Sequence, residues 1–75
     1  MENRIFILKT KQSKKYVDTT YCIAIFKLGT GYTEFIIGET DNDRKYKVGD
    51  ETSYVYNADY VFNLDDAIAW LKRQE

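Results

Sequence analysis

A single cysteine, Cys22, and the absence of histidine limit how this chain of 75 residues can stabilise its fold. One cysteine cannot form an internal disulfide, and the sequence lacks the cysteine and histidine sets that hold structural zinc. A small domain of this kind therefore depends on its hydrophobic core. Twelve aromatic residues suit that need, because each buries a large apolar area. We predict one globular domain over residues 1–75.

The composition excludes several broad classes of protein. Hydrophobic residues make up 44% of the chain, charged residues 31%, and the formal net charge is −1, which is typical of neither a disordered nor a fibrous protein. No apolar stretch reaches the length of a membrane span, and the first residues lack the pattern of a signal peptide. We therefore expect a soluble cytoplasmic protein without a membrane partner.

Short runs of β-branched and aromatic residues predict strands along most of the chain. The first strand is expected at residues 5–8, followed by a polar, basic loop over residues 9–15. The second is expected at 16–28, with a continuous apolar centre that indicates a central strand covered on both faces. Cys22 lies within that centre and is interpreted as a core residue.

Turn-forming residues divide the rest of this strand-rich region. Gly29 and Gly31 predict a tight β-hairpin between the second strand and a third at residues 32–39. The alternation of lysines with Tyr46 and Val48 predicts a half-exposed edge strand at 44–48. A fifth strand is expected at residues 52–56, with Tyr54 and Tyr56 on one face.

One helix is predicted at the end of the chain. Asn63 is a suitable N-cap, acidic residues follow it, and Lys72 and Arg73 match the negative end of the helix dipole. Apolar residues recur at helical spacing and should lie across the sheet; they are Leu64, Ala67, Ile68 and Leu71. Phe62 is expected to pack on Ala67 as a hydrophobic staple. The predicted fold is α+β, an antiparallel meander sheet of four to five strands with one C-terminal helix packed on one face.

Charge is distributed unevenly along the sequence, which bears on the choice of partner. Residues 1–15 carry a net charge of +4, whereas residues 34–66 carry −6. If folding keeps these regions apart, the acidic surface attracts a basic partner. Tyrosines near the acidic stretch, including Tyr60, are of the type enriched at binding hot spots. The predicted protein-binding residues are Asp41, Asp43, Asp50, Glu51, Tyr54, Tyr56 and Asp59.

The basic segment supports an alternative function, binding of nucleic acid. Its lysines would contact phosphates while a tyrosine stacks on a base; the residues are Lys9, Lys11, Lys14, Lys15 and Tyr16. No known nucleic-acid recognition motif accompanies them. A third reading is sequestration of a small molecule between the sheet and the helix or at an oligomer interface. Either a monomer or a homodimer joined through an edge strand fits the sequence.

Enzymatic and cofactor-dependent functions receive no support from the sequence. Histidine, the commonest general base, is absent. Glu39, Asp41, Asp43 and Asp50 have the spacing of some calcium-loop ligands, but Arg44 replaces the glycine that such a loop requires. We therefore predict no catalytic residues, no metal site and no cofactor.

By elimination the sequence favours a protein-binding module, either an adaptor or an inhibitor. Its small size, its charged surface and the lack of a catalytic set are similar to those of small phage and mobile-element inhibitors, the anti-CRISPR proteins among them. No motif matches a named family of such inhibitors. The analogy implies a mechanism in which acidic residues mimic phosphates and occlude a basic site on the target.

Overall fold

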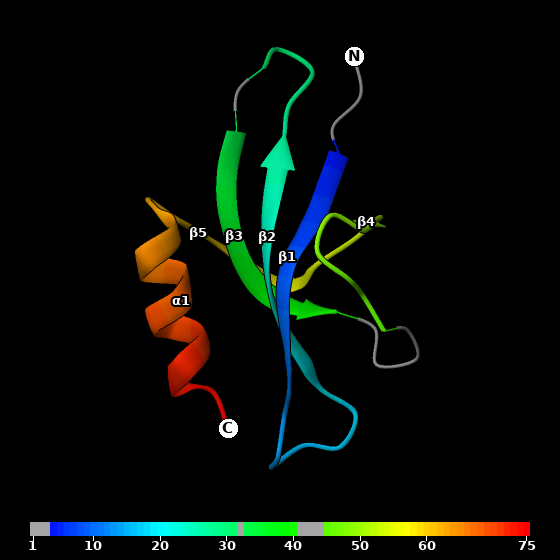
Figure 1. Ribbon diagram of the computed structural model, residues 1–75, viewed down its shortest axis with the longest axis vertical. Coiled ribbons are helices and arrows are strands. Elements are labelled where there is room, and N and C mark those ends of the chain that lie inside the picture. Colours follow the sequence, from blue (N-terminus) through cyan, green and yellow to red (C-terminus); the bar gives the residue numbers. More distant parts are fainter. Residues whose placement is uncertain (1–3, 32, 41–44) are drawn as a thin grey trace.

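The computed structural model describes residues 4–31, 33–40 and 45–75, and within them the chain forms an antiparallel sheet and a C-terminal helix (Figure 1). The elements are β1 (Arg4–Gln12), β2 (Thr20–Lys27), β3 (Thr33–Thr40), β4 (Glu51–Thr52), β5 (Tyr56–Val61) and α1 (Leu64–Arg73). The order across the sheet is β4-β1-β2-β3-β5. The first three strands form a meander, after which the chain adds β4 beside β1 and returns to add β5 beside β3. The predicted α+β class is confirmed.

Strand β2 is the centre of the fold, as the sequence predicts. Cys22, Ile23 and Ala24 are all buried, because successive side chains of a strand enter the cores on opposite faces of the sheet. On one face Ile23 packs with Ile37 and with the helix. On the other, Cys22 and Ala24 pack with a second cluster, completed by Ile7, Ile36 and Val55.

The helix begins and ends where its sequence signals indicate. The side chain of Asn63 accepts a hydrogen bond from the Asp66 amide at 2.9 Å, which confirms the predicted N-cap. Ala67 and Leu71 are buried against the sheet, and α1 contacts β2, β3 and β5. The ring of Trp70 meets that of Tyr21 edge-on at 5.9 Å. In Figure 1, β5 leads directly into the first turn of this helix.

The predicted hydrophobic staple is wrong. The side chain of Phe62 is 98% exposed, whereas Ala67 is fully buried, so the two do not pack together. Ala67 instead packs with Ile23 and Ile37 of the sheet. An aromatic side chain is therefore left in solvent between β5 and α1.

The boundaries of the first two strands also differ from the prediction. β1 continues to Gln12, which pairs with Thr20, so Lys9 and Lys11 lie on a strand and not in a loop. The turn is confined to residues 13–19, where the hydroxyl of Ser13 accepts hydrogen bonds from the amides of Lys15 and Tyr16. Backbone pairing extends β1 beyond its apolar run, and for that reason hydropathy alone misplaced its end. The predicted hairpin is confirmed, with Gly31 N donating to Leu28 O at 2.9 Å.

The strand expected at residues 44–48 is not formed by its described residues, 45–48. The amide of Lys47 donates to the carboxylate of Asp50 at 2.8 Å, and the amide of Asp50 donates to the carbonyl of Lys47 at 3.0 Å. These bonds fold the segment into a turn in which Gly49 has a φ of 90°. Tyr46 packs against the core on the face opposite α1, which explains the apparent alternation.

The strand expected at residues 52–56 is divided between the two edges of the sheet. Thr52 ends β4, Tyr56 begins β5, and residues 53–55 cross between them. The crossing chain lies against Gly38, where an added Cβ would be 2.6 Å from the Tyr56 carbonyl oxygen and 2.6 Å from Cγ1 of Val55. Val55 is buried as a result. Glycine at position 38 is therefore needed for close approach.

We predict that Gly38→Ala destabilises the protein by about 2 kcal/mol, because the new methyl group overlaps a backbone oxygen that cannot move independently. Urea unfolding followed by circular dichroism measures the change. The matched control is Thr33→Ala, at an exposed position of the same strand, which should alter the free energy of unfolding by less than about 0.5 kcal/mol. Equal midpoints for Gly38→Ala and the parent chain would contradict the close approach.

Candidate functional site

The face of the sheet opposite α1 is only partly covered. Tyr46 and Val55 pack on one part of it, and next to them lies an open groove of about 420 Å³. This tyrosine groove is lined by residues from β1, β2, β3, β5 and the crossing segment, among them Ile5, Phe26, Ile36, Tyr54, Ala58 and Tyr60. The open face therefore combines apolar walls with exposed aromatic side chains.

Three tyrosines stand at or beside the tyrosine groove. Tyr54 and Tyr56 meet edge-on with ring centroids 4.9 Å apart, so the structure brings together two of the predicted site residues. The ring centroids of Tyr60 and Phe26 are 6.5 Å apart. Side-chain exposure of 60% for Tyr54 and 62% for Tyr60 leaves large aromatic areas in solvent, as is typical of anchor residues at protein interfaces.

A second hollow adjoins the first on the far side of Tyr60. This edge groove has a volume of about 280 Å³ and is lined by Thr33, Glu34, Phe35, Tyr60, Val61 and Phe62. Tyr60 is common to the lining of both grooves. Phe62 and Phe26 were not among the predicted site residues. No strand was predicted at residues 57–61, so no local signal placed Phe62 beside an edge of the sheet.

Two of the predicted acidic residues have partners within the protein. Glu51 accepts two hydrogen bonds from the guanidinium of Arg4, at 2.9 and 3.0 Å. The hydrogen bond from Arg4 lowers the pKa of the Glu51 carboxyl below its usual value. Asp50 uses its carboxylate to close the turn at Lys47. Both carboxylates thus contribute to the attachment of β4 at the edge of the sheet.

The other predicted acidic residues are separated from the tyrosines or lie outside the description. Asp59 pairs with Ile37, which belongs to the core under α1, so its exposed side chain lies on the helix face of the sheet. Tyr60 pairs with Ile36 and lies on the opposite face. Asp41 and Asp43 are outside the described residues. The predicted surface therefore consists of Tyr54 in the groove of the open face, Tyr56 in contact with it, and Asp59 on the helix face.

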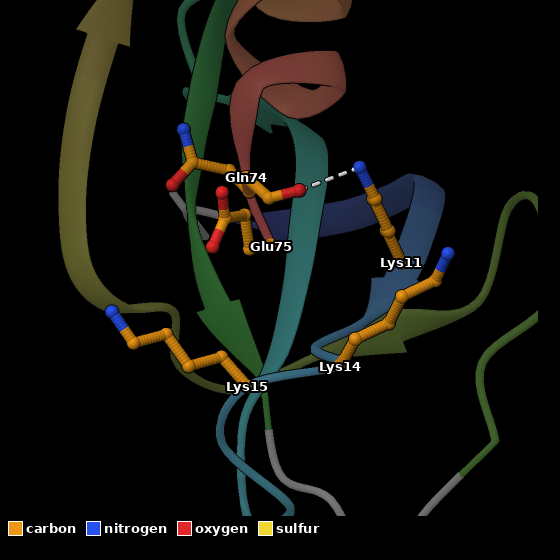
Figure 2. A pocket seen from close by; sticks show the side chains of 5 residues that line it. All are labelled: Lys11, Lys14, Lys15, Gln74 and Glu75. Atoms are coloured by element: carbon orange, nitrogen blue, oxygen red, sulfur yellow. Dashed lines mark hydrogen bonds between the residues drawn. The ribbon is translucent and has the colours of Figure 1, made fainter.

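The predicted basic site is divided as well. Lys11 points to the end of α1, where its ammonium donates to the carbonyls of Leu71 at 3.2 Å, Lys72 at 3.4 Å and Gln74 at 2.6 Å. Figure 2 shows the bond from Lys11 to Gln74 beside the side chains of Lys14 and Lys15. These residues and Glu75 line a hollow of about 380 Å³. Lys11 thus adds a charged donor to carbonyls at the end of the helix, of which that of Leu71 also accepts a hydrogen bond from the Gln74 amide at 3.2 Å.

The exposed part of the basic site is the turn after β1. Lys14, Lys15 and Tyr16 are exposed there, with the Lys15 ammonium 5.5 Å from the centre of the Tyr16 ring. Lys9 is exposed on β1. The turn retains the cations and the aromatic ring that contact with a nucleic-acid backbone requires.

We predict that Lys11→Met lowers the free energy of unfolding by about 1–2 kcal/mol, because the helix carbonyls lose a charged hydrogen-bond donor. Lys14→Met removes the same charge from an exposed side chain of the adjacent turn and should change stability by less than about 0.5 kcal/mol. Chemical unfolding of both variants measures the difference. If they unfold alike, Lys11 does not cap the helix.

Cys22 has no access to solvent and lies within the core on the open-face side. Desolvation by burial, and to a smaller extent the negative charge of Glu39, raise the pKa of its thiol to about 12. The thiolate is the reactive form, so this cysteine is not suited to nucleophilic chemistry. Its interpretation as a core residue is confirmed.

We predict that the Cys22 thiol of the folded protein is almost unreactive toward a disulfide reagent at about pH 8 and reacts fully in denaturant. The raised pKa also sets a pH dependence, because the unfolded chain releases the thiol proton near pH 9 while the folded chain holds it to about pH 12. Stability therefore falls as the pH rises above about 9, and less so in Cys22→Ala. Rapid labelling of the native protein would contradict the burial of Cys22.

No group of three or more histidine, cysteine, aspartate or glutamate residues among those that the structure describes is placed to hold a metal ion. No helix in the described part of the chain is long and apolar enough to cross a membrane.

Comparison with known proteins does not assign the chain to a family. No family model, no curated protein and no solved structure matches it significantly.

Proposed function

We propose that this protein is a small non-enzymatic binding module that acts in the cytoplasm by docking another protein on its tyrosine groove. The observation that carries the proposal is the grouping of three exposed tyrosines beside an apolar groove on a sheet face that α1 does not cover. Tyrosine supplies a large contact area with little loss of side-chain entropy, and therefore serves well as an anchor.

The charge of the second half of the chain favours a partner with a basic surface. Between Val48 and Leu71 the chain carries five acidic residues and neither lysine nor arginine. Such a field speeds the approach of a cationic surface and disfavours an anionic one. In this proposal the tyrosines provide affinity and the carboxylates provide steering. An adaptor and an inhibitor that occludes a basic site on its target would both use the surface in this way.

We predict that replacing both Tyr54 and Tyr60 with alanine removes stoichiometric capture of the partner by the tagged protein from its native lysate. Loss of each anchor should weaken binding by about 30-fold, as for hot-spot residues. The control is Tyr16→Ala, which removes an exposed tyrosine from the β1–β2 turn. Thermal unfolding should change little, since both groove tyrosines are exposed.

The same capture experiment distinguishes the nucleic-acid alternative, which the exposed trio of Lys14, Lys15 and Tyr16 favours. If nuclease removes all captured material, and Lys14→Glu with Lys15→Glu has the same effect, the binding module is a nucleic-acid protein and our proposal fails. A protein partner that resists nuclease and is lost only from the Tyr54/Tyr60 variant supports it. If the protein instead sequesters a small molecule, neither nuclease treatment nor the Tyr54/Tyr60 substitution should remove a captured macromolecule.

A further inference from the structure

Strand β5 forms an edge of the sheet that lacks several of the usual protections. The sheet of the described residues ends at β5 on one side and at the two-residue strand β4 on the other. Natural edge strands are commonly kept short or given lysine or proline, because their outer backbone groups readily pair with another strand. β5 has six residues and contains no lysine, arginine or proline. Its one irregularity is a bulge at Asn57, near its start, where φ is 52°.

The side chains along β5 present a different chemistry on each face of the sheet. Tyr60 lies on the open face, and Phe62, which follows the end of the strand and is 98% exposed, lines the edge groove with it. On the helix face, Asp59 is exposed beside Val61. A strand added at this edge would place alternate side chains on the two faces. Apolar residues would meet Tyr60 and Phe62, and the intervening residues would meet a carboxylate.

Charge argues against a second copy of the chain as the added strand. Asp59 lies on β5 itself, and Asp65 and Asp66 are exposed in the first turn of α1, directly after it. Two copies joined edge to edge would bring these carboxylates together without a lysine or arginine from either β5 to neutralise them. Like charges across a strand pair are destabilising. The same carboxylates would stabilise a basic segment.

We propose that the outer edge of β5 is the docking site for an extended segment of the partner protein in which apolar and basic residues alternate. The segment adds to the sheet as a further strand, through backbone hydrogen bonds that give affinity, while the side chains on each face give specificity. This inference rests on the proposed function and specifies its partner. The apolar side chains fill the edge groove, and the basic side chains lie beside Asp59.

Synthetic peptides test the proposal without knowledge of the natural partner. The probe is a labelled peptide of about ten residues in which valine and lysine alternate, and its binding to the full chain is followed by fluorescence anisotropy. A peptide alternating valine and glutamate should bind at least about tenfold more weakly. Amide hydrogen exchange should slow at residues 58–61 when the valine–lysine peptide is bound.

Backbone pairing is separated from simple charge attraction by two N-methylated forms of the valine–lysine peptide. One carries methyl groups on the valine amides and the other on the lysine amides. In an added strand only one of these two sets faces β5, so one form should lose binding by at least about tenfold and the other should retain it. Equal binding of the two forms would overturn the proposal.

A charge reversal in the protein tests the role of Asp59. Asp59→Lys should reverse the order of the two peptide affinities, so that the valine–glutamate peptide binds more tightly than the valine–lysine peptide. Asp18→Lys makes the same charge change in the β1–β2 turn and should leave the order of affinities as in the parent chain. An unchanged order in Asp59→Lys would show that this aspartate does not contact the added strand.

Two further outcomes would overturn the proposal that the outer edge of β5 is a docking site. One is failure of every peptide to bind, and the other is a concentration-dependent dimer that protects residues 58–61 without peptide, since the occupant would then be a second copy. Neither outcome touches the proposed function, which fails only if the captured partner survives the loss of Tyr54 and Tyr60 or disappears with nuclease. The two proposals can therefore fail separately.

Discussion

The close approach of the chain to Gly38 determines how the second half of this protein is arranged. Because position 38 has no side chain, residues 53–55 can cross the open face in contact with β3, and Val55 enters the core. The crossing carries the chain from β4 at one edge to β5 at the other. An edge position for β5, the exposure of the tyrosines beside it and the start of α1 all follow from that path.

The two faces of the sheet are consequently covered to different extents. On one face, α1 packs over β2 and β3, and the Lys11 ammonium donates hydrogen bonds to backbone carbonyls at the end of the helix. On the other, a short crossing segment protects only part of the apolar surface and leaves the tyrosine groove open. A chain with one free cysteine and no internal disulfide thus keeps a well-covered core around β2 and still exposes a large aromatic area. That combination underlies the proposed binding role.

Local signals predicted the parts of the fold that local interactions determine. Asn63 and the helix that follows it, the hairpin at Gly29–Gly31 and the buried centre of β2 were all evident from capping, turn and hydropathy patterns. Residues 45–48 and 53–55 were misassigned because tertiary contacts decide their structure: Asp50 closes a turn, and Gly38 admits the crossing chain. The site was predicted in part. Tyr54 and Tyr56 meet as expected, although not on the single strand that was predicted to bring them together, whereas the Arg4–Glu51 ion pair joins residues far apart in sequence.

Native-state hydrogen exchange on the free protein tests the central claim, that β5 is an open edge beside a well-ordered core, most directly. Amides of β2, which is paired on both sides, should exchange slowest. Along residues 58–61, amides that face β3 should be protected and those that face outward should exchange rapidly, giving an alternating pattern. Uniform protection of β5 to the level of β2 would contradict the account, because the edge would already be covered.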